Sequence, residues 1–446
     1  MLTATAVDRT ALIDWYRRNR ERSAALFDMI DPTAYCTRPI SLRNPIVFYE
    51  GHLPAFSVLA FLRRGLGLTS IDLRLEKLFE RGIDPDSELA AVPRSGASTI
   101  WPSRDDVLGF ARACDRAVLE AIAGFNPTPE AVEGLYTALE HEAMHQETLL
   151  YMFHRLPYDL KRRVSMGEGR LPMSDAPVSR ATAAILASVV VPAGEAVLGV
   201  DRANVTFGWD NEFNRHVVHV PSFQMDVLPV TNEQFLEFVD AGGYSNRELW
   251  DDEGWEWIQS QHVQHPAFWE RTSDIGHRPS AIGHRSPALE HPYHWRAMFH
   301  SEPLPPDWPV YVSRAEASAY ARWKGRRLMT EPEWHRAAEG ASGGHADFAG
   351  FDPVAVGSHP QTASVHGVHD LIGNGWEWTS TVFAPFDGFT PMRSYPEYSA
   401  DFFDGRHYVM KGASPATARE LIRPSFRNWF RGNYPYVYAK FRTVSR

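Results

Sequence analysis

The stretch that decides the fold of the first part of the chain is residues 131–156, AVEGLYTALEHEAMHQETLLYMFHRL. Apolar residues recur in it at steps of three and four, a spacing that predicts an amphipathic helix. Thr128 lies just before this stretch and is suited to cap the first turn of the helix. His141 and His145 lie four residues apart in the middle of it, so both side chains share one face and can bind the same metal ion.

Residues 141–145 read HEAMH, which also matches the zinc-protease motif HExxH. In such a protease Glu142 would be the general base, and the extended motif would need Gly at position 148 and His at position 151. The chain has Thr148 and Tyr151 there. The common protease branch is therefore disfavoured, and a zinc-dependent hydrolase stays as an alternative only.

A third metal ligand is better sought upstream, in residues 48–56, FYEGHLPAF. His52 is the one histidine of this segment and lies where an apolar, helix-like run opens. Three neutral imidazoles without a thiolate leave coordination positions vacant, which suits Fe(II) or catalytic zinc. The plainer interpretation is that the later pair faces solvent or satisfies hydrogen bonds in a core.

Composition limits the classes of function. A chain of 446 residues should form two or three domains, and 44% hydrophobic with 22% charged residues is an ordinary globular composition. The net charge of −10 and scattered basic residues disfavour nucleic-acid binding. The start of the chain is polar and no run is long enough to span a bilayer, so we expect a cytoplasmic protein without a membrane partner. Only Cys36 and Cys114 are present, too few for a disulfide scaffold or an iron-sulfur site, and we expect both to be buried.

The chain divides into two parts of different texture. Helical periodicity recurs in residues 12–30, 53–66, 107–122 and 131–156, which predicts a four-helix bundle over residues 1–164. Residues 165–188 lack periodicity and are rich in Gly, Pro, Ser and Met, as is typical of a linker.

Residues 189–446 contain short apolar runs, many aromatic residues and frequent Gly and Pro. Two helices in this part are expected to begin with capping boxes, Ser313 with Glu316 and Thr330 with Glu333. We therefore predict an α+β protein: a helical bundle followed by an irregular, loop-rich domain.

Six motifs in the second part closely resemble the formylglycine-generating-enzyme fold, which is C-type-lectin-like. They are VPAG (191–194), LPVTNEQF (228–235), RLMTEPEW (327–334), GNGWEWT (373–379), KGAS (411–414) and FR (441–442). A formylglycine-generating enzyme works through cysteines in this domain, and residues 190–446 contain none. The resemblance therefore implies the fold without that activity.

A DinB-like bundle carrying YEGH (49–52) and HxxxHxE (141–147), joined to this fold, resembles the sulfoxide synthases of ergothioneine and ovothiol biosynthesis. The resemblance implies a non-heme Fe(II) enzyme whose metal ligands are His52, His141 and His145. In that family a thiolate donor and dioxygen bind at the iron, and the thiol sulfur is joined to an imidazole carbon and oxidised to a sulfoxide. A metal-bound thiol ionises near neutral pH, and iron would hold both reactants within bonding distance.

The resemblance also implies where the second substrate binds. Hercynine, or trimethylhistidine, has a quaternary ammonium that no hydrogen bond can satisfy, so aromatic faces and polar oxygens must surround it. Asn428 and Trp429 match the family's Arg-Asn-Trp motif and are expected to bind this group. Trp376 and Trp378 are expected to be core residues.

Several positions depart from the actinobacterial branch of that family. Phe430 and Tyr434 stand where that branch has Asp and Arg, which help to hold γ-glutamylcysteine, so a glutamyl donor is disfavoured. Met144 replaces a Gln that helps to orient the last iron ligand, and we expect Met144 and Phe430 to lie at the substrate site. No motif identifies the proton-donating tyrosine, for which Tyr395 and Tyr398 are the candidates.

These departures leave a sister activity open, the selenoneine synthases, which join a selenium donor to hercynine on the same scaffold. Three classes of function are thus distinguished by experiment. A carbon-sulfur or carbon-selenium bond-forming enzyme requires iron, dioxygen, hercynine and a thiol or selenol donor. A zinc hydrolase works without dioxygen, and a noncatalytic binding module survives loss of all three histidines.

Overall fold

The computed structural model describes residues 7–80, 100–164, 187–273 and 292–445, and these form two compact units. The first unit contains the N-terminal helices together with two segments from much later in the chain, Asp201–Phe213 and Asp387–Asp401. The second unit contains the remainder, Leu171–Val200, Asn214–Phe386 and Phe402–Arg446. The linker expected at 165–188 lies outside the described residues except for its last two positions, where strand β1 begins at Ser188.

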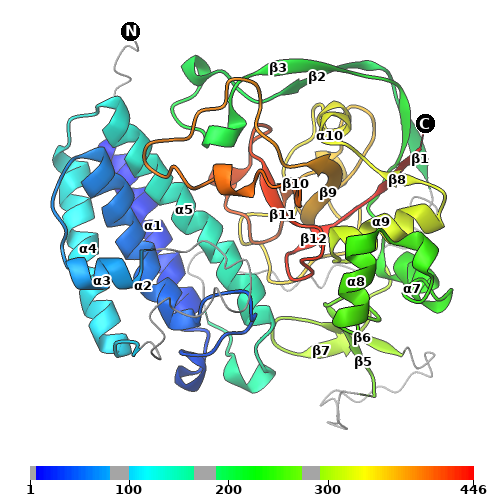
Figure 1. The fold of residues 1–446 in the computed structure, drawn as a ribbon, viewed down its shortest axis with the longest axis horizontal. Helices are drawn as coiled ribbons and strands as arrows, with labels where there is room; N and C mark the ends of the chain where they lie inside the picture. The colour runs from blue at the N-terminus through cyan, green and yellow to red at the C-terminus, as the bar shows by residue number, and fades with distance from the viewer. Residues whose placement is uncertain (1–6, 81–99, 165–186, 274–291, 446) are drawn as a thin grey trace. The chain divides into compact units, whose positions relative to one another are not determined.

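Four long helices of the first unit pack against one another (Figure 1). The helical elements of this unit are α1 (Arg9–Phe27), α2 (Ile46–Ser57), the π-helical stretch η2 (Val58–Gly65), α3 (Leu73–Leu78), α4 (Arg104–Gly124) and α5 (Pro129–His154). The four long helices predicted from apolar spacing are thus confirmed. The second one begins seven residues earlier than expected, at Ile46, so that His52 lies well inside a helix.

Helix α2 is buried around its whole circumference, as all twelve of its residues are shielded from solvent. A helix that is apolar on every side is stable only inside a protein. Its one carboxylate, on Glu50, is satisfied there by the guanidinium of Arg104 on α4, with an Nη2–Oε1 distance of 2.8 Å, and by the Tyr35 hydroxyl. This pairing removes the penalty of a lone buried charge beside the candidate ligand.

The second unit is a mixed α+β structure with small sheets. Its helices are α7 (Asn232–Asp240), α8 (Asp252–Ser260), α9 (Arg314–Trp323) and α10 (Glu331–Ala337). Its strands are β1 (Ser188–Val191), β2 (Gly194–Leu198), β3 (His216–Val220), β4 (Phe223–Asp226), β5 (Trp269–Arg271), β6 (Tyr293–Arg296), β7 (Ser301–Pro303), β8 (Arg327–Leu328), β9 (Gly375–Val382), β10 (His407–Ala413), β11 (Asn428–Arg431), β12 (Ala439–Lys440) and β13 (Thr443–Ser445).

These strands form sheets in the orders β1-β4-β13-β8, β11-β10-β9-β12, β2-β3 and β5-β6-β7. All pairs are antiparallel except β12 with β9, which is parallel. Both predicted capping boxes are present, at the starts of α9 and α10. Trp376 and Trp378 are buried on β9, as expected.

An ion cluster lies inside the second unit. The carboxylate of Glu377 on β9 accepts from Lys440 Nζ at 2.9 Å and from Arg442 Nε at 2.8 Å, and all three side chains are fully buried. The two cations hold the pKa of Glu377 below its usual value even though burial acts in the opposite direction. The cluster therefore joins β9 to the C-terminal segment from within the core.

The two cysteines differ in exposure. Cys114 is buried on α4, but Cys36 is exposed, so the expectation that both thiols are buried was wrong for Cys36. It lies in the turn after the short 3-10 helix at 32–34, where nothing covers it. Among the described residues, no helix combines the length and apolar character needed to cross a bilayer.

The element η2 directly continues α2, which carries His52. Close contact between α5 and η2 therefore sets the spacing of the two helices that carry the histidines. A methyl group built on Gly134 of α5 would lie 2.3 Å from the Ala60 carbonyl oxygen of η2, far inside contact distance. The contacting group is backbone, which cannot rotate away. Gly134 is therefore required for the packing of these two elements.

We predict that Gly134→Ala destabilises the first unit by about 1–3 kcal/mol, because the helices must separate to admit the methyl group. The matched control is Gly109→Ala on α4, where the nearest atom to a new methyl is the end of a flexible arginine at 3.8 Å. That control should be neutral or stabilising by up to about 1 kcal/mol, since alanine favours helix. Urea denaturation followed by circular dichroism measures both, and equal midpoints for the two variants would contradict the prediction.

Candidate metal centre

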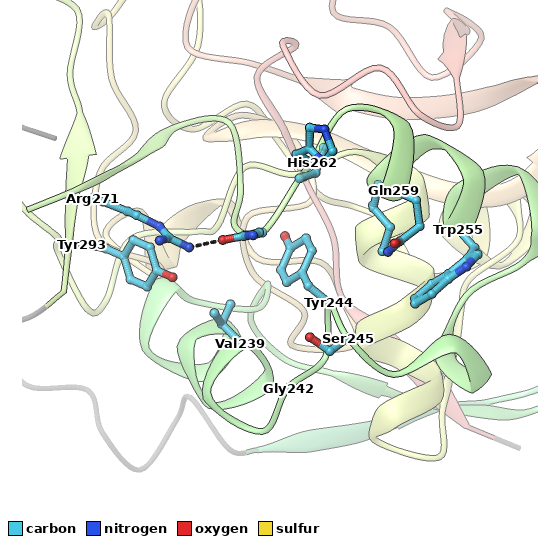
Figure 2. Close-up of a pocket in the computed structure, with 12 residues that line it drawn as sticks. Val239, Gly242, Tyr244, Ser245, Trp255, Gln259, His262, Arg271 and Tyr293 are labelled. Carbon is cyan, nitrogen blue, oxygen red and sulfur yellow. Dashed lines mark hydrogen bonds between the residues drawn. The ribbon is translucent and has the colours of Figure 1, made fainter. Parts of the chain in front are cut away.

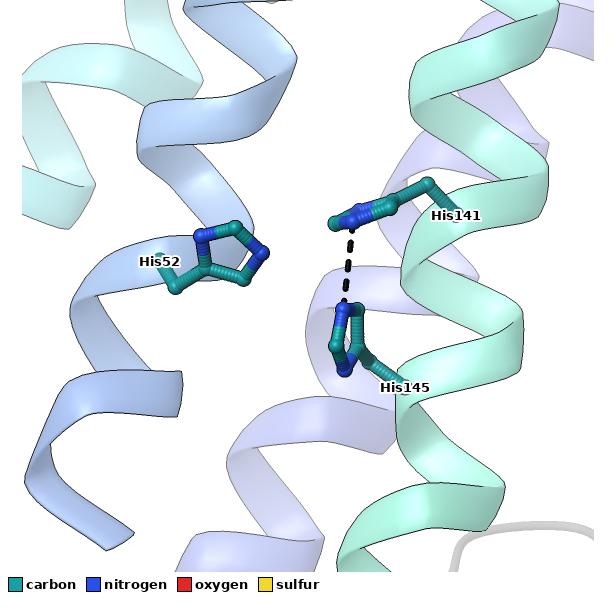
Figure 3. Close-up of side chains that lie close together, drawn as sticks. All are labelled: His52, His141 and His145. Carbon is teal, nitrogen blue, oxygen red and sulfur yellow. Dashed lines mark hydrogen bonds between the residues drawn. The ribbon is translucent and has the colours of Figure 1, made fainter. Parts of the chain in front are cut away.

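Three histidines of the first unit converge on one point between α2 and α5. His52 extends from α2 towards His141 and His145 on α5, and the latter two lie one above the other (Figure 3). One ring nitrogen from each lies within 4.8 Å of those from the other two. Within the described ranges this is the one such group of three or more His, Cys, Asp or Glu side chains.

The nitrogen positions fit a transition-metal ion. The Nε2 atoms of His141 and His145 are 3.1 Å apart. Imidazole nitrogens bind such ions at about 2.0–2.1 Å, so two of them at right angles around one ion lie about 3 Å apart. The Nε2 atom of His52 is buried and has no hydrogen-bond partner in the structure. A buried nitrogen without a partner is costly, and a metal ion would satisfy it.

The ring of His52 is held by a backbone group. Its Nδ1 donates to the carbonyl oxygen of Phe79 over 2.7 Å, which leaves the Nε2 lone pair for a metal. The Phe79 ring packs directly over Gly51, where an added methyl would meet ring carbons at 2.4–2.6 Å. The absence of a side chain at Gly51 thus allows Phe79 to sit where its carbonyl reaches His52.

The other two histidines are held by aromatic packing. Phe56 stacks on the His141 ring, with centroids 3.5 Å apart and an interplanar angle of 15°. Tyr49 packs on His145 with ring centroids 5.6 Å apart. The Nδ1 atoms of both histidines are buried without a protein partner. Orientation on this side therefore comes from ring contacts on α2 rather than from hydrogen bonds.

Burial keeps these imidazoles neutral. It lowers the pKa of His52 to about 4, although the Phe79 carbonyl acts in the opposite direction. The pKa values of His141 and His145 are also well below the usual value, first because of burial and then because of neighbouring positive groups, including the other histidines. Neutral imidazole is the form that binds metals, so the site is prepared for an ion near neutral pH.

Glu142 does not share this site. Its Oε1 atom accepts from Arg20 Nη1 at 2.9 Å and from Ser23 Oγ at 2.6 Å, both on α1. Arg20 also pairs with Asp115 on α4 at 3.0 Å, so this network joins three helices on the opposite side of α5. A carboxylate occupied in this way is not available as the general base of a zinc hydrolase, and that alternative loses its main support.

Both candidate tyrosines lie in the first unit, on the segment Asp387–Asp401. The Tyr395 ring contacts His141 edge-on, with centroids 5.9 Å apart, and also packs on Phe56 at 4.9 Å. The Tyr398 hydroxyl donates to Met144 Sδ at 3.4 Å, and its ring stacks on Trp209 at 3.9 Å. The structure thus brings Tyr395, Tyr398 and Met144 to the histidines, while their roles stay predictions.

The tyrosine segment is anchored on both sides of Tyr395 and Tyr398. Ser394 donates through N and Oγ to Glu133 Oε1, both at 2.9 Å, and its hydroxyl also bonds Thr137 at 2.8 Å. Ser399 donates to Asp210 at 2.5 Å. Burial raises the pKa of Asp210 to about 6, despite this hydrogen bond. Side chains from α5 and from the segment 201–213 thus fix the loop that carries the tyrosines.

Asn428, Trp429 and Phe430 belong to β11 in the second unit. Trp429 is partly buried and stacks on the buried Phe383, with ring centroids 4.2 Å apart and an angle of 5°. Phe430 stacks on Tyr434 at 5.2 Å. Binding of a trimethylammonium group by Asn428 and Trp429 stays a prediction.

A separate cavity of about 660 Å³ lies in the second unit, between α7, α8 and strands β5 and β6. Figure 2 shows its polar lining, in which the Arg271 guanidinium donates to Gln264. Further polar groups in that lining come from Tyr244, Ser245, Gln259, His262 and Tyr293. None of the site residues predicted from the sequence lines this cavity, and we assign it no role.

Sequence reasoning missed the residues that support the site. Phe56 and Phe79 follow His52 in ordinary apolar patterns, and Trp209 and Ser399 lie in loops far from the histidines in sequence. Only Phe56, at four residues from His52, carried a signal, because that spacing places it on the same helix face. The other contacts depend on the tertiary fold.

The chain is similar to known proteins over most of its length. Residues 174–446 match the family described as sulfatase-modifying factor enzyme 1-like domain. Hercynine oxygenase of Mycolicibacterium smegmatis is 32% identical, over 95% of this chain and 96% of that protein. Hercynine oxygenase of Mycobacterium tuberculosis is 31% identical, over 94% of each chain. Ergothioneine biosynthesis protein 1 of Neurospora crassa is 27% identical, over 91% of this chain and 54% of that protein.

We predict that the protein binds Fe(II), or Co(II) as a spectroscopic probe, at the three histidines. Replacing His52, His141 or His145 by Ala should weaken metal binding by more than about 100-fold. Loss of a metal ligand reduces the affinity more than loss of a residue that only orients a ligand. His219→Ala, at an exposed position on β3, is the control and should bind as the wild type does. Titration of the Co(II) absorption bands measures this, and unchanged binding in His52→Ala would exclude that ligand.

We also predict that Gly51→Ala weakens metal binding by about 10–100-fold, because the new methyl displaces Phe79 and breaks the bond that orients His52. The double variant Gly51→Ala/Phe79→Leu should recover much of the affinity, since the smaller side chain makes room while the backbone carbonyl remains. The same Co(II) titration applies. If the double variant binds no better than the single one, crowding of Phe79 is not the cause.

Proposed function

Because the chain belongs to the ergothioneine sulfoxide synthase family, we propose that it is an iron(II)- and dioxygen-dependent enzyme that joins hercynine to a small thiol and forms a sulfoxide. The observation that carries the proposal is the group of the buried His52 and His141 with the partly buried His145, three neutral donors with no carboxylate among them. We further propose that the first unit is the DinB-like bundle of this family.

Ferrous iron bound by these histidines would supply the site at which a thiolate and dioxygen meet. The protein's own groups do the rest of the work. Phe79 keeps His52 in one tautomer, and Phe56 fixes the His141 ring. Buried aromatic side chains around the histidines limit access of water, which would compete for the vacant positions.

The phenol of a tyrosine on the anchored segment is the proposed proton donor. Tyr395 is favoured because its ring contacts a ligand histidine directly. Tyr398 is the alternative, since its hydroxyl donates to the weak acceptor Met144 Sδ and is easily redirected. Replacement of the true donor by Phe should lower sulfoxide formation while leaving metal binding intact.

For hercynine we propose Asn428 and Trp429. The Trp429 and Phe383 rings form a parallel stack in the second unit, and aromatic faces attract a quaternary ammonium. Asn428 provides an amide for the polar side of the same group. These assignments rest on the family motif and on the chemistry of the ligand.

The thiol donor is proposed to be small. Phe430 and Tyr434 stack on each other, and neither carries a charge that would pair with the amino and carboxylate groups of a γ-glutamyl extension. Cysteine lacks this extension, and so does a small selenol. A selenium donor, which would make the protein a selenoneine synthase, is the second candidate on the same observation.

We predict oxygen uptake only when iron, hercynine and a donor are all present. Cysteine should be used with a kcat/KM about 10–100-fold above that of γ-glutamylcysteine, the range expected when a charged group finds no partner. An oxygen electrode and mass spectrometry of the product measure this for cysteine, γ-glutamylcysteine and a small selenol.

A faster reaction with the selenol than with cysteine would identify a selenoneine synthase. Zinc-loaded protein is the control and should be inactive. Equal activity with zinc and without dioxygen would exclude the oxidative reaction and favour a hydrolase, and tight hercynine binding without any turnover would favour a binding module.

A further inference from the structure

We propose that Trp209, with Glu140 as its proton acceptor, is a redox-active residue that receives oxidising equivalents escaping from the metal centre and passes them outward through the first unit. The proposal rests on the iron site of the proposed function, but it adds an activity that bond formation does not require. All of its residues belong to the first unit.

A continuous series of aromatic rings leads from the histidines to Trp209. Tyr395 lies 5.9 Å from His141 and 5.8 Å from Tyr398, measured between ring centroids. Tyr398 then stacks on Trp209 at 3.9 Å with an interplanar angle of 29°. Electron transfer over ring contacts of this length needs no movement of the chain, and tyrosine and tryptophan are the side chains whose rings are most readily oxidised.

Trp209 has a base in place beside its indole. Its side chain is fully buried, and its indole Nε1 donates to Glu140 Oε2 at 2.8 Å. An oxidised indole is a strong acid, so its proton can pass to that carboxylate. Loss of this proton stabilises the electron vacancy on Trp209.

The series continues to less buried rings. Phe207 lies 5.5 Å from Trp209 and 5.8 Å from Tyr136, and Tyr136 lies 5.9 Å from Trp15. Tyr136 and Trp15 are both partly exposed. Burial raises the pKa of Tyr136, and the nearby Glu140 carboxylate raises it further. The same carboxylate thus acts on both oxidisable neighbours, Trp209 and Tyr136. An oxidising equivalent that leaves Trp209 can thus reach the partly exposed rings of Tyr136 and Trp15.

The electron balance is simple. When a turnover fails, the oxidised metal centre gains one electron, Trp209 loses it, and the Nε1 proton moves to Glu140. Trp209 regains an electron from Tyr136 or Trp15 and takes its proton back from Glu140, while the outer ring that lost the electron releases one proton to solvent. A thiol in solution then supplies one electron and one proton to the outer ring and becomes a thiyl radical, which couples with a second one to a disulfide.

Such a path protects the buried site. Several rings contact the histidines, among them Phe56 at 3.5 Å and Tyr395 at 5.9 Å from His141, and Phe48 at 5.0 Å from His52. An oxidant left from a failed turnover would otherwise attack these rings or the histidines themselves. Transfer to Trp209 moves the damage away from the metal ligands.

The test uses the full-length protein loaded with Fe(II) and mixed with hydrogen peroxide in the absence of hercynine and donor. Freeze-quench electron paramagnetic resonance detects the radical, and peptide mass spectrometry locates oxygenated residues. Wild-type protein should give a deprotonated tryptophan radical and oxidation at Trp209 and Trp15. Trp209→Phe should lose that signal and shift oxidation to Tyr395, Phe56 and the histidines.

Glu140→Gln provides a second variant that still accepts a hydrogen bond but is no base, and its tryptophan radical should stay protonated or fail to accumulate. The matched control is Trp295→Phe in the second unit, since Trp295 is also fully buried with its indole N–H on a carboxylate, that of Asp352 at 3.1 Å. This control should behave as the wild type does.

Unchanged radical yield and oxidation sites in Trp209→Phe, or the same damage in zinc-loaded protein, would overturn the relay. Because no organic substrate is added, the result is independent of hercynine turnover. Absence of turnover in the separate oxygen-uptake assay would refute the proposed function alone, whereas absence of bound iron would refute both.

Discussion

The site depends on how closely the backbones of α2, η2 and α5 approach. Only with this approach does His52 meet two histidines from a helix that follows about ninety residues later. Two glycines permit it, since a side chain at Gly134 would meet the backbone of η2 and one at Gly51 would meet the Phe79 ring. The free energy gained by burying α2 on all sides thus also brings three neutral nitrogens together, and each of them would be costly to bury without a metal.

Charge is separated from the metal site by helix geometry. On α5, His141 and His145 face α2, whereas Glu142 points to Arg20 and Ser23 on α1. On α2, Glu50 turns to Arg104 while His52 faces α5. The carboxylates of Glu50 and Glu142 are therefore used for helix packing. The candidate centre keeps an all-nitrogen donor set, which leaves the metal's remaining positions to exogenous ligands.

The first unit is completed by two segments from later in the chain, Asp201–Phe213 and Asp387–Asp401. Tyr395 and Tyr398 reach the histidines because Ser394 and Ser399 anchor their loop to α5 and to Asp210. Trp209 joins the same group of rings through Tyr398 and Glu140. A helical bundle alone would provide the metal ligands but neither the phenols nor the indole, so the chemistry that we propose needs both halves of the chain.

The sequence by itself determined the four helices and the two capping boxes, and it placed His141 and His145 on one helix face, because helical periodicity and the four-residue spacing of these histidines are local properties. It also determined the family, through motifs spread over most of the chain. Tertiary structure decided that Cys36 is exposed and that Glu142 is engaged elsewhere. It also decided that Phe79 and Tyr395 contact the histidines, with Tyr398 and Trp209 packed behind Tyr395. These are contacts between residues distant in sequence, and their formation depends on packing that no local pattern encodes.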